Sequence, residues 1–405
     1  SVDSDRFRIT LADYSDKQLS SVNSTDLLKS AIDFHENPFH GFFEKYLKPK
    51  IADSNSEYIG ISLCYLNQAL ISFALAGWIK NHFKDKKIIL GGGLVSSWMS
   101  RPDFDNPFAE LIDVMVKGEG EQQLVSILGK HPSNKRHFVP DYGFVENDTY
   151  LSPWKILPFR ASIGCYWSKC RFCPEKAETR PYNSQRSQKV IEDVKKVSRL
   201  YKPDVIHFID NAVTPAFLRG LSQTENDFKW YGFVRFEKDF EDLQFCRDLK
   251  KSGCEMLKLG LESGDQNVLN QMNKGTELNL ASRTLINLNS AGILTYVYLL
   301  FGTSFEDEKS AYKTLDFIEQ HHSYIDYLNL AVFNLPKFSE DADDLETREF
   351  YHGDLSLYLN FIHPKGWERK KVKHFIDKEF KKKIYAHKNI RKNPYLFSSN
   401  HAMFF

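Results

Sequence analysis

The chain lacks several features that would assign it to a class at once. Its 405 residues contain no run that approaches the roughly 18 uninterrupted apolar residues of a membrane span, and no signal peptide, internal repeat or low-complexity segment is recognisable. The formal net charge is only +1, which does not favour nucleic acid or an anionic membrane as the main partner. Hydrophobic residues make up 42%, so the chain can bury ordinary cores, and its length favours two or three domains.

Cysteine is also scarce, and it is unevenly placed. Three of the six cysteines lie within the nine residues from Cys165 to Cys173, while Cys64, Cys246 and Cys254 are scattered. A secreted disulfide framework would spread its cysteines, so this pattern favours a metal site in a reducing compartment such as the cytoplasm. We expect Cys246 and Cys254 to be buried structural residues.

Apolar segments of strand length alternate with segments of helical periodicity in two parts of the chain. In the first part, strands are expected at 58–63, 87–90 and 112–116, and helices at 66–83 and 122–128. After a polar, proline-containing linker, strands are expected at 159–164, 204–210, 229–236, 255–261, 293–301 and 326–333, with helices in the gaps, for example at 189–200, 241–252, 265–272 and 307–320. Such alternation predicts parallel sheets.

The predicted fold is therefore α/β. It consists of a Rossmann-like domain over 1–135, a partial barrel of six β/α units over 155–335, and a C-terminal region over 336–405 that packs on the barrel. The aromatic end of the chain is too apolar for a free tail, so we expect it to dock. His401 in that tail is either an acid or base at the active site or an ordinary histidine.

The cysteine cluster is the strongest chemical signal. Cys165, Cys170 and Cys173 directly follow the first expected barrel strand, and barrel enzymes place their chemistry at this end of the strands. Structural zinc usually needs a fourth ligand nearby, but the next candidates are His207 and Cys246. Three thiolates on a cluster of four irons leave one iron open. A zinc knuckle completed by a distant residue is the alternative.

The segment Gly164-Cys-Tyr-Trp-Ser-Lys-Cys-Arg-Phe-Cys173 resembles the signature of the radical S-adenosylmethionine superfamily. The family's commonest spacing is C-x3-C-x2-C, whereas the spacing here is C-x4-C-x2-C, which resembles members that carry a cobalamin-binding domain. The resemblance implies that Cys165, Cys170 and Cys173 hold a [4Fe–4S] cluster whose open iron takes S-adenosylmethionine. An electron from the cluster would break the C5′–S bond and give a 5′-deoxyadenosyl radical. Phe172 would lie beside the adenine.

Residues at the ends of later strands match further family positions. Asp210 and Asn211 correspond to polar residues for the methionine amino group, although the common Gly-Gly-Glu is absent. Arg235 matches a position that pairs with the methionine carboxylate or nearby polar groups, and a guanidinium fork suits a carboxylate. Glu262 and Ser263 match the segment for the ribose and methionine.

Two tyrosines share one face of the fifth expected strand. Tyr296 and Tyr298 either point into the barrel near a substrate or serve ordinary packing. No catalytic residue is identified.

The N-terminal domain is similar to a truncated cobalamin-binding domain. The matching positions lie in three segments that end expected strands, namely Ser62, Gly91, Gly92, Gly93, Gly118 and Glu119. The usual D-x-H-x-x-G loop is missing, because Pro38 takes the place of its glycine near His35. An imidazole ligand to cobalt is therefore not supported, and a cofactor-free scaffold domain is the alternative.

Three functions follow from these observations. The first is a cobalamin-dependent radical methyltransferase that acts on an unactivated carbon of a small molecule or peptide. The second is a cobalamin-independent radical enzyme that catalyses a rearrangement, cyclisation or cleavage. Both would take electrons from a donor such as flavodoxin or ferredoxin. The third is a zinc-stabilised binding protein without enzymatic activity.

Overall fold

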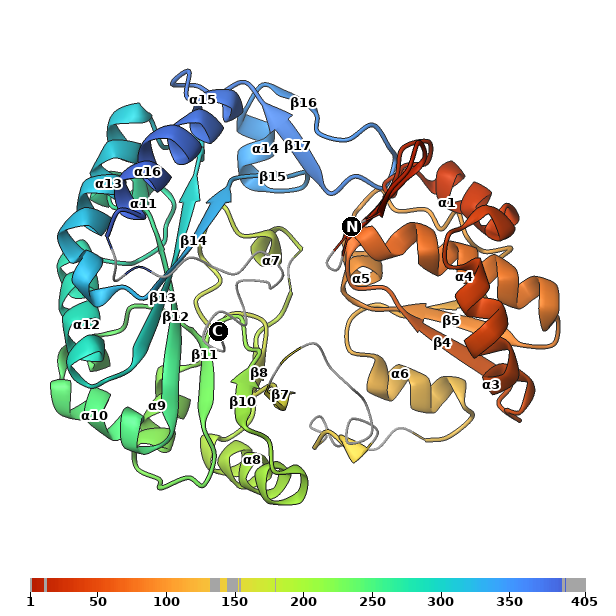
Figure 1. Cartoon of the computed structure of the whole chain (residues 1–405), viewed down its shortest axis with the longest axis horizontal. Helices are drawn as coiled ribbons and strands as arrows, with labels where there is room; N and C mark the ends of the chain where they lie inside the picture. The colour runs from red at the N-terminus through yellow and green to blue at the C-terminus, as the bar shows by residue number, and fades with distance from the viewer. Residues whose placement is uncertain are drawn as a thin grey trace. The chain divides into compact units, whose positions relative to one another are not determined.

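Contacts within the chain separate it into two units. The first consists of Ser1–Arg136, Pro336–Phe338 and Thr347–Asn360, and the second of His137–Leu335, Ser339–Glu346 and Phe361–Phe405. The computed structural model describes residues 2–10, 13–131, 139–143, 152, 154–178, 180–387 and 390. Both units combine helices with parallel strands, so the predicted α/β class is confirmed (Figure 1).

A six-stranded parallel sheet forms the centre of the second unit, and its strands pair in chain order. They are β7 (Ile156–Phe159), β10 (Val205–Phe208), β11 (Trp230–Val234), β12 (Cys254–Glu262), β13 (Leu294–Phe301) and β14 (Tyr327–Val332). Aromatic, leucine and β-branched residues fill these runs, as buried parallel strands require. The last five expected strands of this part of the chain are confirmed within a few residues.

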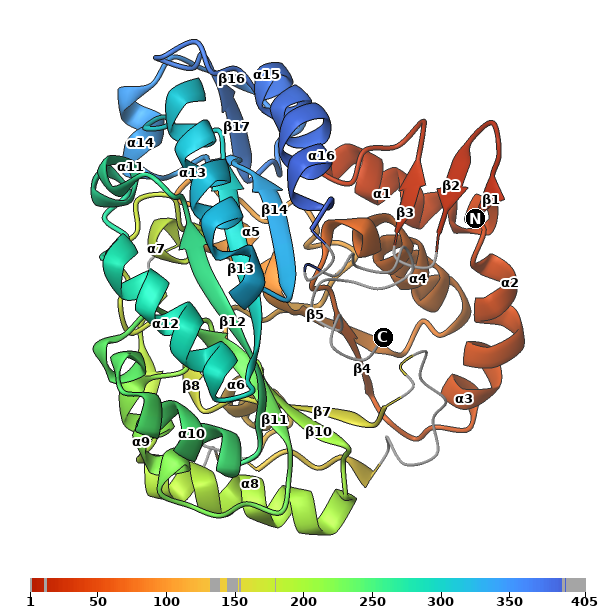
Figure 2. The same cartoon turned by 60° about the vertical axis from the view of Figure 1, so that its left-hand side comes forward.

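Helices connect successive strands of this sheet and cover one of its faces (Figure 2). They are α8 (Ser187–Tyr201), α9 (Pro215–Ser222), α10 (Leu243–Lys251), α11 (Gln266–Gln271), α12 (Leu278–Ser290) and α13 (Glu308–His321). The helix α8 buries Val190, Ile191, Val194 and Val197, which recur at the spacing of one helical face. Leu257, Leu259 and Leu261 of β12 join the same hydrophobic core.

The opposite face of the sheet carries a different set of side chains. Successive side chains of a strand point to opposite faces, so Lys258, Gly260 and Glu262 face away from the leucines of β12. Tyr296 is fully buried in an aromatic cluster of this face, and Tyr298 is half-buried with its ring 5.0 Å from that of Tyr296. The predicted shared face of these two tyrosines is confirmed.

The expected strand at 159–164 is misplaced. Strand β7 ends at Phe159, and the next residues form the short strand β8 (Ser162–Ile163), which pairs antiparallel with β9 (Asn183–Ser184) outside the six-stranded sheet. Asp210 is the cause, because its carboxylate accepts hydrogen bonds from the Ala161 N–H (2.9 Å) and the Ser162 hydroxyl (2.6 Å). The cysteines therefore follow β8 rather than a strand of the main sheet.

The first unit contains a smaller parallel sheet, in the order β4 (Tyr58–Ser62), β5 (Lys87–Gly91) and β6 (Val114–Met115). Its helices and turns are α1 (Ser24–Ile32), η1 (Phe34–Glu36), α2 (His40–Phe42), η2 (Phe43–Leu47), α3 (Lys48–Ala52), η3 (Leu66–Gln68), α4 (Ala69–His82), α5 (Gly93–Ser100) and α6 (Gly120–Ile127). The three expected strands are present, although the third is only two residues long.

An antiparallel sheet of β1 (Val2–Asp3), β2 (Phe7–Ile9) and β3 (Tyr14–Asp16) also belongs to the first unit. The sequence analysis predicts neither this sheet nor α5. Across the helices that the structure describes, none is long and apolar enough to cross a membrane.

The C-terminal region is divided between the units, which differs from the expected packing of all of 336–405 on the barrel. Its elements are β15 (Leu335–Pro336), α14 (Glu340–Asp344), β16 (Thr347–Glu349), β17 (Tyr358–Phe361), α15 (Arg369–His374), η7 (Phe375–Phe380) and α16 (Lys381–Ile384). Phe375 and Phe380 pack on Phe301 of β13, with ring centroids 5.9 and 5.4 Å apart. Leu355 instead enters the core of the first unit. The expected docking of the aromatic tail, with His401, lies outside the described residues.

Candidate functional site

The three clustered cysteines lie on one loop between β8 and α7 (Pro174–Ala177). Cys170 is 8% exposed, and Cys165 and Cys173 are partly buried. The Cys173 N–H donates to the Cys170 carbonyl (3.3 Å), and the Cys173 carbonyl accepts from the N–H groups of Lys176 and Ala177 (3.2 and 3.3 Å). These turns keep the C-x2-C part of the motif compact.

Burial makes the thiols of Cys170 and Cys173 poorer acids. Loss of solvent raises the pKa of the Cys170 thiol, although the positive charges of Lys274 and Arg235 oppose that rise. Loss of solvent also raises the pKa of Cys173 to about 11. Thiolates are the form that binds metal, and a bound cation deprotonates such thiols outright. A metal centre bound by the loop would supply the positive charge that keeps Cys170 and Cys173 as thiolates.

The arrangement of potential ligands bears on the kind of metal centre. Throughout the described parts of the chain, no group of three His, Cys, Asp or Glu side chains could hold a metal ion. A zinc ion draws all its ligands to about 2.0–2.3 Å from one point. In an iron–sulfur cluster, by contrast, each thiolate binds a different iron, so its ligands do not share one point. The assignment of the three cysteines to an iron–sulfur cluster stays a prediction.

The four residues between Cys165 and Cys170 anchor the loop to segments distant in sequence. The indole N–H of Trp167 donates to the Asn273 carbonyl (3.0 Å), and the Tyr166 hydroxyl donates to a carboxylate oxygen of Glu237 (2.6 Å). The Trp167 ring lies so close to Gly275, whose φ is +68°, that a Cβ there would lie 2.2 Å from the ring. Only glycine fits such a position. Trp167, one of the four residues between Cys165 and Cys170, thus gives the loop an anchor on the segment after β12.

Two buried cations and one carboxylate lie beside the loop. Lys274 is 5% exposed, and its Nζ lies 2.7 Å from Glu262 Oε1 and 5.5 Å from the ring centroid of Phe172. Arg235 is 4% exposed, and one of its N–H groups donates to the Lys274 carbonyl. The backbone of Glu262 has φ of +68°, which is strained for a residue with a side chain. The structure thus places Phe172, Arg235 and Glu262 of the predicted site together around Lys274.

The predicted residues of the first unit gather at the carboxyl edge of β4, β5 and β6. Ser62 and Gly91 end β4 and β5, and Gly92 has φ of +107° with its Cα so close to the Leu63 backbone that a Cβ would lie 2.5 Å from it. The Gly118 N–H donates to the Ser96 hydroxyl (2.9 Å). The remaining positions, Gly93 and Glu119, begin α5 and precede α6. This edge is exposed at Ser62, Gly93, Gly118 and Glu119.

Comparison with known proteins places these two units in context. No family model matches the chain. It is 25% identical over 242 residues to bacteriochlorophyllide d C-12(1)-methyltransferase of Chlorobaculum tepidum, covering 56% of this chain and 51% of that protein. It is 22% identical over 322 residues to the anaerobic magnesium-protoporphyrin IX monomethyl ester cyclase of Cereibacter sphaeroides, covering 67% and 50%. The chain spans about half the length of these curated relatives.

Solved structures share the fold at low sequence identity. The radical S-adenosylmethionine methyltransferase TsrM from Kitasatospora setae, with tryptophan substrate and an S-adenosylmethionine analogue bound, superposes with a TM-score of 0.59 at 14% identity, covering 85% of this chain and 83% of that one. The cobalamin-dependent radical enzyme OxsB gives a TM-score of 0.51 at 18% identity, covering 67% and 45%. The chain resembles the radical S-adenosylmethionine enzymes. Within that superfamily, the likeness is to cobalamin-dependent members.

Three predicted residues of the radical S-adenosylmethionine site are not among those that gather around Lys274. Both carboxylate oxygens of Asp210 bind the segment that leads to the cysteines, and Asn211 is exposed after β10. Ser263 is fully buried, and its hydroxyl lies 3.3 Å from the Thr314 hydroxyl of α13. The part of Asp210, Asn211 and Ser263 in cofactor binding stays a prediction.

Four residues beside the cysteine loop do not appear among the predicted ones. They are Trp167, Glu237, Lys274 and Gly275. Trp167 lies inside the quoted motif, so the departure from the common spacing is the signal that points to it. Lys274-Gly275 follows the fourth strand, but one sequence does not reveal which face its lysine meets.

A lysine and a histidine of the inner sheet face also escape the sequence analysis. Lys258 is 4% exposed, and its Nζ lies 2.8 Å from His207 Nε2. Burial lowers the pKa of Lys258 to about 8. The His207 ring stacks on Tyr231 at 4.2 Å. These polar groups lie on the same face of the sheet as Gly260 and Glu262, in positions nearer its amino end.

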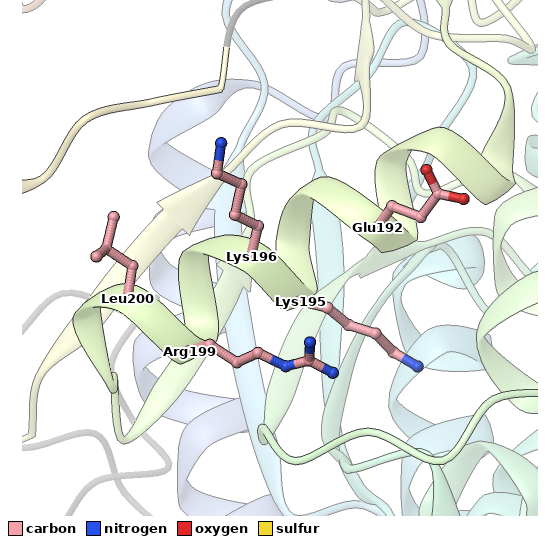
Figure 3. A pocket seen from close by; sticks show the side chains of 5 residues that line it. All are labelled: Glu192, Lys195, Lys196, Arg199 and Leu200. Atoms are coloured by element: carbon pink, nitrogen blue, oxygen red, sulfur yellow. The ribbon is translucent and has the colours of Figure 1, made fainter.

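A surface hollow of about 670 Å³ lies along α8. It is lined by Glu192, Lys195, Lys196, Arg199 and Leu200 (Figure 3). Lys195 donates to the Glu225 carbonyl (3.1 Å), and Arg199 lies 3.8 Å from Asp227. The hollow contains no predicted site residue, and its charges are those of a solvated helix face.

Proposed function

We propose that the chain is a radical S-adenosylmethionine enzyme, and that it methylates an unactivated carbon in a small molecule or peptide with the help of cobalamin. The observation that carries the proposal is the single loop with Cys165, Cys170 and Cys173, anchored beside the carboxyl end of the six-stranded parallel sheet. The fold of the cobalamin-dependent radical enzymes and the methyltransferase relative support it.

In this proposal, Cys165, Cys170 and Cys173 hold a [4Fe–4S] cluster. A cluster with three protein thiolates keeps one iron for S-adenosylmethionine and supplies the electron that breaks its C5′–S bond to give a 5′-deoxyadenosyl radical. The chain's own part is to hold the three thiolates and to bury that of Cys170 from water. The solved TsrM structure with cobalamin and a [4Fe–4S] cluster bound supports the choice of cofactors.

Phe172, Lys274 and Glu262 are the residues that we propose to orient S-adenosylmethionine. Phe172 offers an aromatic face for the adenine, on the loop that also carries the thiolates. Lys274 is held by Glu262 at 2.7 Å, so its ammonium group keeps a fixed direction in a site that excludes water. A fixed cation of this kind suits the methionine carboxylate.

Cobalamin is proposed to bind at the carboxyl edge of the small sheet in the first unit. The residues there are small, and Gly92 leaves no room for a side chain, so the backbone can approach a flat ligand. His35 lies in η1 with its ring 5.9 Å from that of Phe34, so no histidine ligand to cobalt is proposed.

The cobalamin-independent enzyme is the second candidate. The relative named as a cyclase, which matches 67% of the chain, supports the cyclisation that this candidate includes. A cyclase forms a carbon ring without transferring a methyl group. The zinc-stabilised binding protein finds no support in the ligand arrangement around the cysteines.

A flavodoxin or ferredoxin is proposed as the electron donor, and the cytoplasm as the compartment. The relatives act on ring systems, as the names bacteriochlorophyllide and magnesium-protoporphyrin and the tryptophan in TsrM indicate. We therefore extend the proposal to a substrate that contains an aromatic or macrocyclic ring.

Anaerobic turnover tests the function. The iron-loaded chain is supplied with S-adenosylmethionine, a reductant, and cobalamin or none, and 5′-deoxyadenosine and S-adenosylhomocysteine are quantified. The methyltransferase predicts cobalamin retained by the purified chain and both products in the presence of substrate. Formation of 5′-deoxyadenosine alone, without cobalamin binding, would favour the second candidate. Neither product under any condition would refute both.

A further inference from the structure

Arg235 has an unusual environment for a residue expected to face a cofactor carboxylate. Its guanidinium carbon lies 4.3 Å from the centroid of the Trp167 ring, and its Nη1 lies 4.0 Å from Cys170 Sγ, within hydrogen-bonding distance for sulfur. Its Nη2 donates to the Lys274 carbonyl. The guanidinium thus has a ring on one side, a backbone carbonyl at one end and a cysteine sulfur at another.

Glu237, whose carboxylate lies near this guanidinium, also accepts a hydrogen bond from Tyr166. Glu237 Oε1 lies 3.7 Å from Arg235 Nε, but the Tyr166 hydroxyl donates to that same oxygen at 2.6 Å. Arg235 Nε is buried and has no hydrogen-bond partner among the described residues. Arg235 therefore forms an ion pair with Glu237 at 3.7 Å, and its other end meets the sulfur of Cys170.

Trp167, one of the four residues between Cys165 and Cys170, holds this geometry. Its indole N–H is tied to the Asn273 carbonyl, and its ring rests on Gly275. A guanidinium stacks well on an aromatic face, and it loses little freedom when it is held there. Trp167 and Lys274 therefore hold Arg235 against the sulfur of Cys170, where an isolated arginine side chain would turn away.

A fixed positive charge beside a cluster-ligating sulfur favours the reduced state, because reduction adds one negative charge to the centre. Hydrogen bonds to the sulfurs and net charge are known means by which proteins set the potential of an iron–sulfur cluster. Arginine keeps its proton at any working pH, so no bond forms or breaks at the guanidinium itself. The one electron comes from the external donor.

We propose that Arg235, stacked on Trp167, is a positioning residue that donates a hydrogen bond to Cys170 Sγ and raises the reduction potential of the centre held by the three cysteines. This inference rests on the proposed function, since it requires the cluster. It gives Arg235 a different role from the predicted pairing with the methionine carboxylate.

The test is a reductive titration of the reconstituted full-length chain without S-adenosylmethionine, followed by electron paramagnetic resonance. Arg235→Gln removes the charge, Arg235→Lys keeps the charge without the fork, and Trp167→Leu removes the stacking ring. Arg219→Gln is the matched control, because this exposed guanidinium binds Asp239 and lies on α9. Iron per chain is measured for each variant, so that loss of the cluster is separated from a change in its potential.

We expect Arg235→Gln to keep its iron, and its ratio of reduced to oxidised cluster at a fixed potential to fall at least tenfold. A tenfold change in this ratio corresponds to a shift of about 59 mV in reduction potential for a one-electron couple. The reduction potential of Trp167→Leu should fall as well, and that of Arg235→Lys should fall less. The potential of Arg219→Gln should equal that of the wild type. If Arg235→Gln loses its iron, the reduction potentials of Arg235→Lys and Trp167→Leu decide whether Arg235 raises the potential of the cluster.

Unchanged potentials in iron-loaded Arg235 and Trp167 variants would overturn the inference and leave the proposed function standing. If those variants instead bind S-adenosylmethionine more weakly, the carboxylate role is the correct one. A wild-type chain that takes up no iron would refute the proposed function itself.

Discussion

Glu306 is the most deeply buried carboxyl group near the carboxyl end of β13. It is fully buried, its Oε2 accepts from the Gly302 N–H (2.5 Å) and the Trp367 indole N–H (3.0 Å), and its Oε1 has no partner among the described residues. Loss of solvent raises the pKa of Glu306 from its ordinary value of 4.5 to about 8. The folded chain therefore binds this proton more tightly than the unfolded chain does.

The sign of the resulting pH dependence follows from linkage. The contribution of the proton to stability is complete below the unfolded pKa of 4.5, and it is lost as pH rises toward the folded pKa of about 8. Relative to Glu306→Gln, the wild type should lose on the order of 4 kcal/mol in free energy of unfolding between about pH 5 and about pH 9. Urea unfolding at both pH values measures this difference.

The exposed Glu308 offers the matched control for this experiment. Glu308→Gln should follow the wild type at every pH. If Glu306→Gln also follows the wild type, the carboxyl of Glu306 is ionised in the folded chain and its assignment as a protonated group is wrong.

Gly275 makes a second prediction at the scale of one residue. An alanine there meets both a left-handed backbone and the Trp167 ring at 2.2 Å, whereas Gly292 has a similar φ of +75° and nothing within 4 Å. Gly292→Ala should therefore lose about 1 kcal/mol of stability, and Gly275→Ala a further 1–3 kcal/mol or so from the clash. Thermal unfolding measures both.

The same pair of glycine variants separates the role of the loop from general stability. Gly275→Ala should take up less iron than Gly292→Ala after identical reconstitution, because a displaced Trp167 carries the cysteine loop with it. Equal iron content in the two variants would contradict the anchoring role of Trp167.

The sequence reveals the chemistry of this site more fully than its geometry. The cluster of three cysteines in nine residues is evident from the sequence alone. Arg235 and Glu262 are also identifiable, because they lie at the ends of expected strands. The stacking of Arg235 on Trp167 is hidden, because it depends on which way a four-residue loop turns. Long-range partners such as Asn273 for Trp167 leave no local pattern.

At the scale of elements, long strands are predictable and short ones are not. The nine-residue run of β12 buries eight of its residues, and apolar residues such as Leu257, Leu259 and Leu261 recur at every second position. The segment after β7 has similar apolar residues, but the carboxylate of Asp210, 48 residues from Ser162, draws it out of the sheet. The local pattern of apolar residues does not reveal a hydrogen bond to a residue so distant in sequence.

The segment Thr347–Asn360 behaves as part of the first unit, although the sequence places it hundreds of residues away. Leu355 is 2% exposed in that unit's core, its N–H donates to the Val22 carbonyl (2.9 Å), and Asp354 accepts from the Ser24 N–H (2.8 Å). Leu355→Ala should therefore lower the free energy of unfolding of the first unit by about 2–5 kcal/mol.

Hydrogen exchange of the wild type and the variant shows which unit is affected. Leu355→Ala should speed exchange in α1 and α4 and leave β12 and β13 unchanged, whereas Tyr351→Ala, at an exposed position, should change neither. Protection lost in the six-stranded sheet instead would contradict the assignment of Thr347–Asn360 to the first unit.

At the scale of the whole molecule, the alternation of strands and helices predicts the α/β class and five of the six parallel strands. The return of the C-terminal region to the first unit is not predictable in this way, because apolar residues such as Leu355 fit either core equally well. The fold agrees with that of cobalamin-dependent radical enzymes over most of the chain, at 14% identity.

The central claim is that Cys165, Cys170 and Cys173 together hold one iron–sulfur cluster. The most direct test is the content of iron and acid-labile sulfide per chain after anaerobic reconstitution, in the wild type, in each single Cys→Ser variant of these three, and in Cys64→Ser, which changes an exposed cysteine. The account predicts about four irons and four sulfides in the wild type and in Cys64→Ser, and a large loss in each of the three loop variants. One zinc per chain without iron, or full iron content after loss of any loop cysteine, would contradict it.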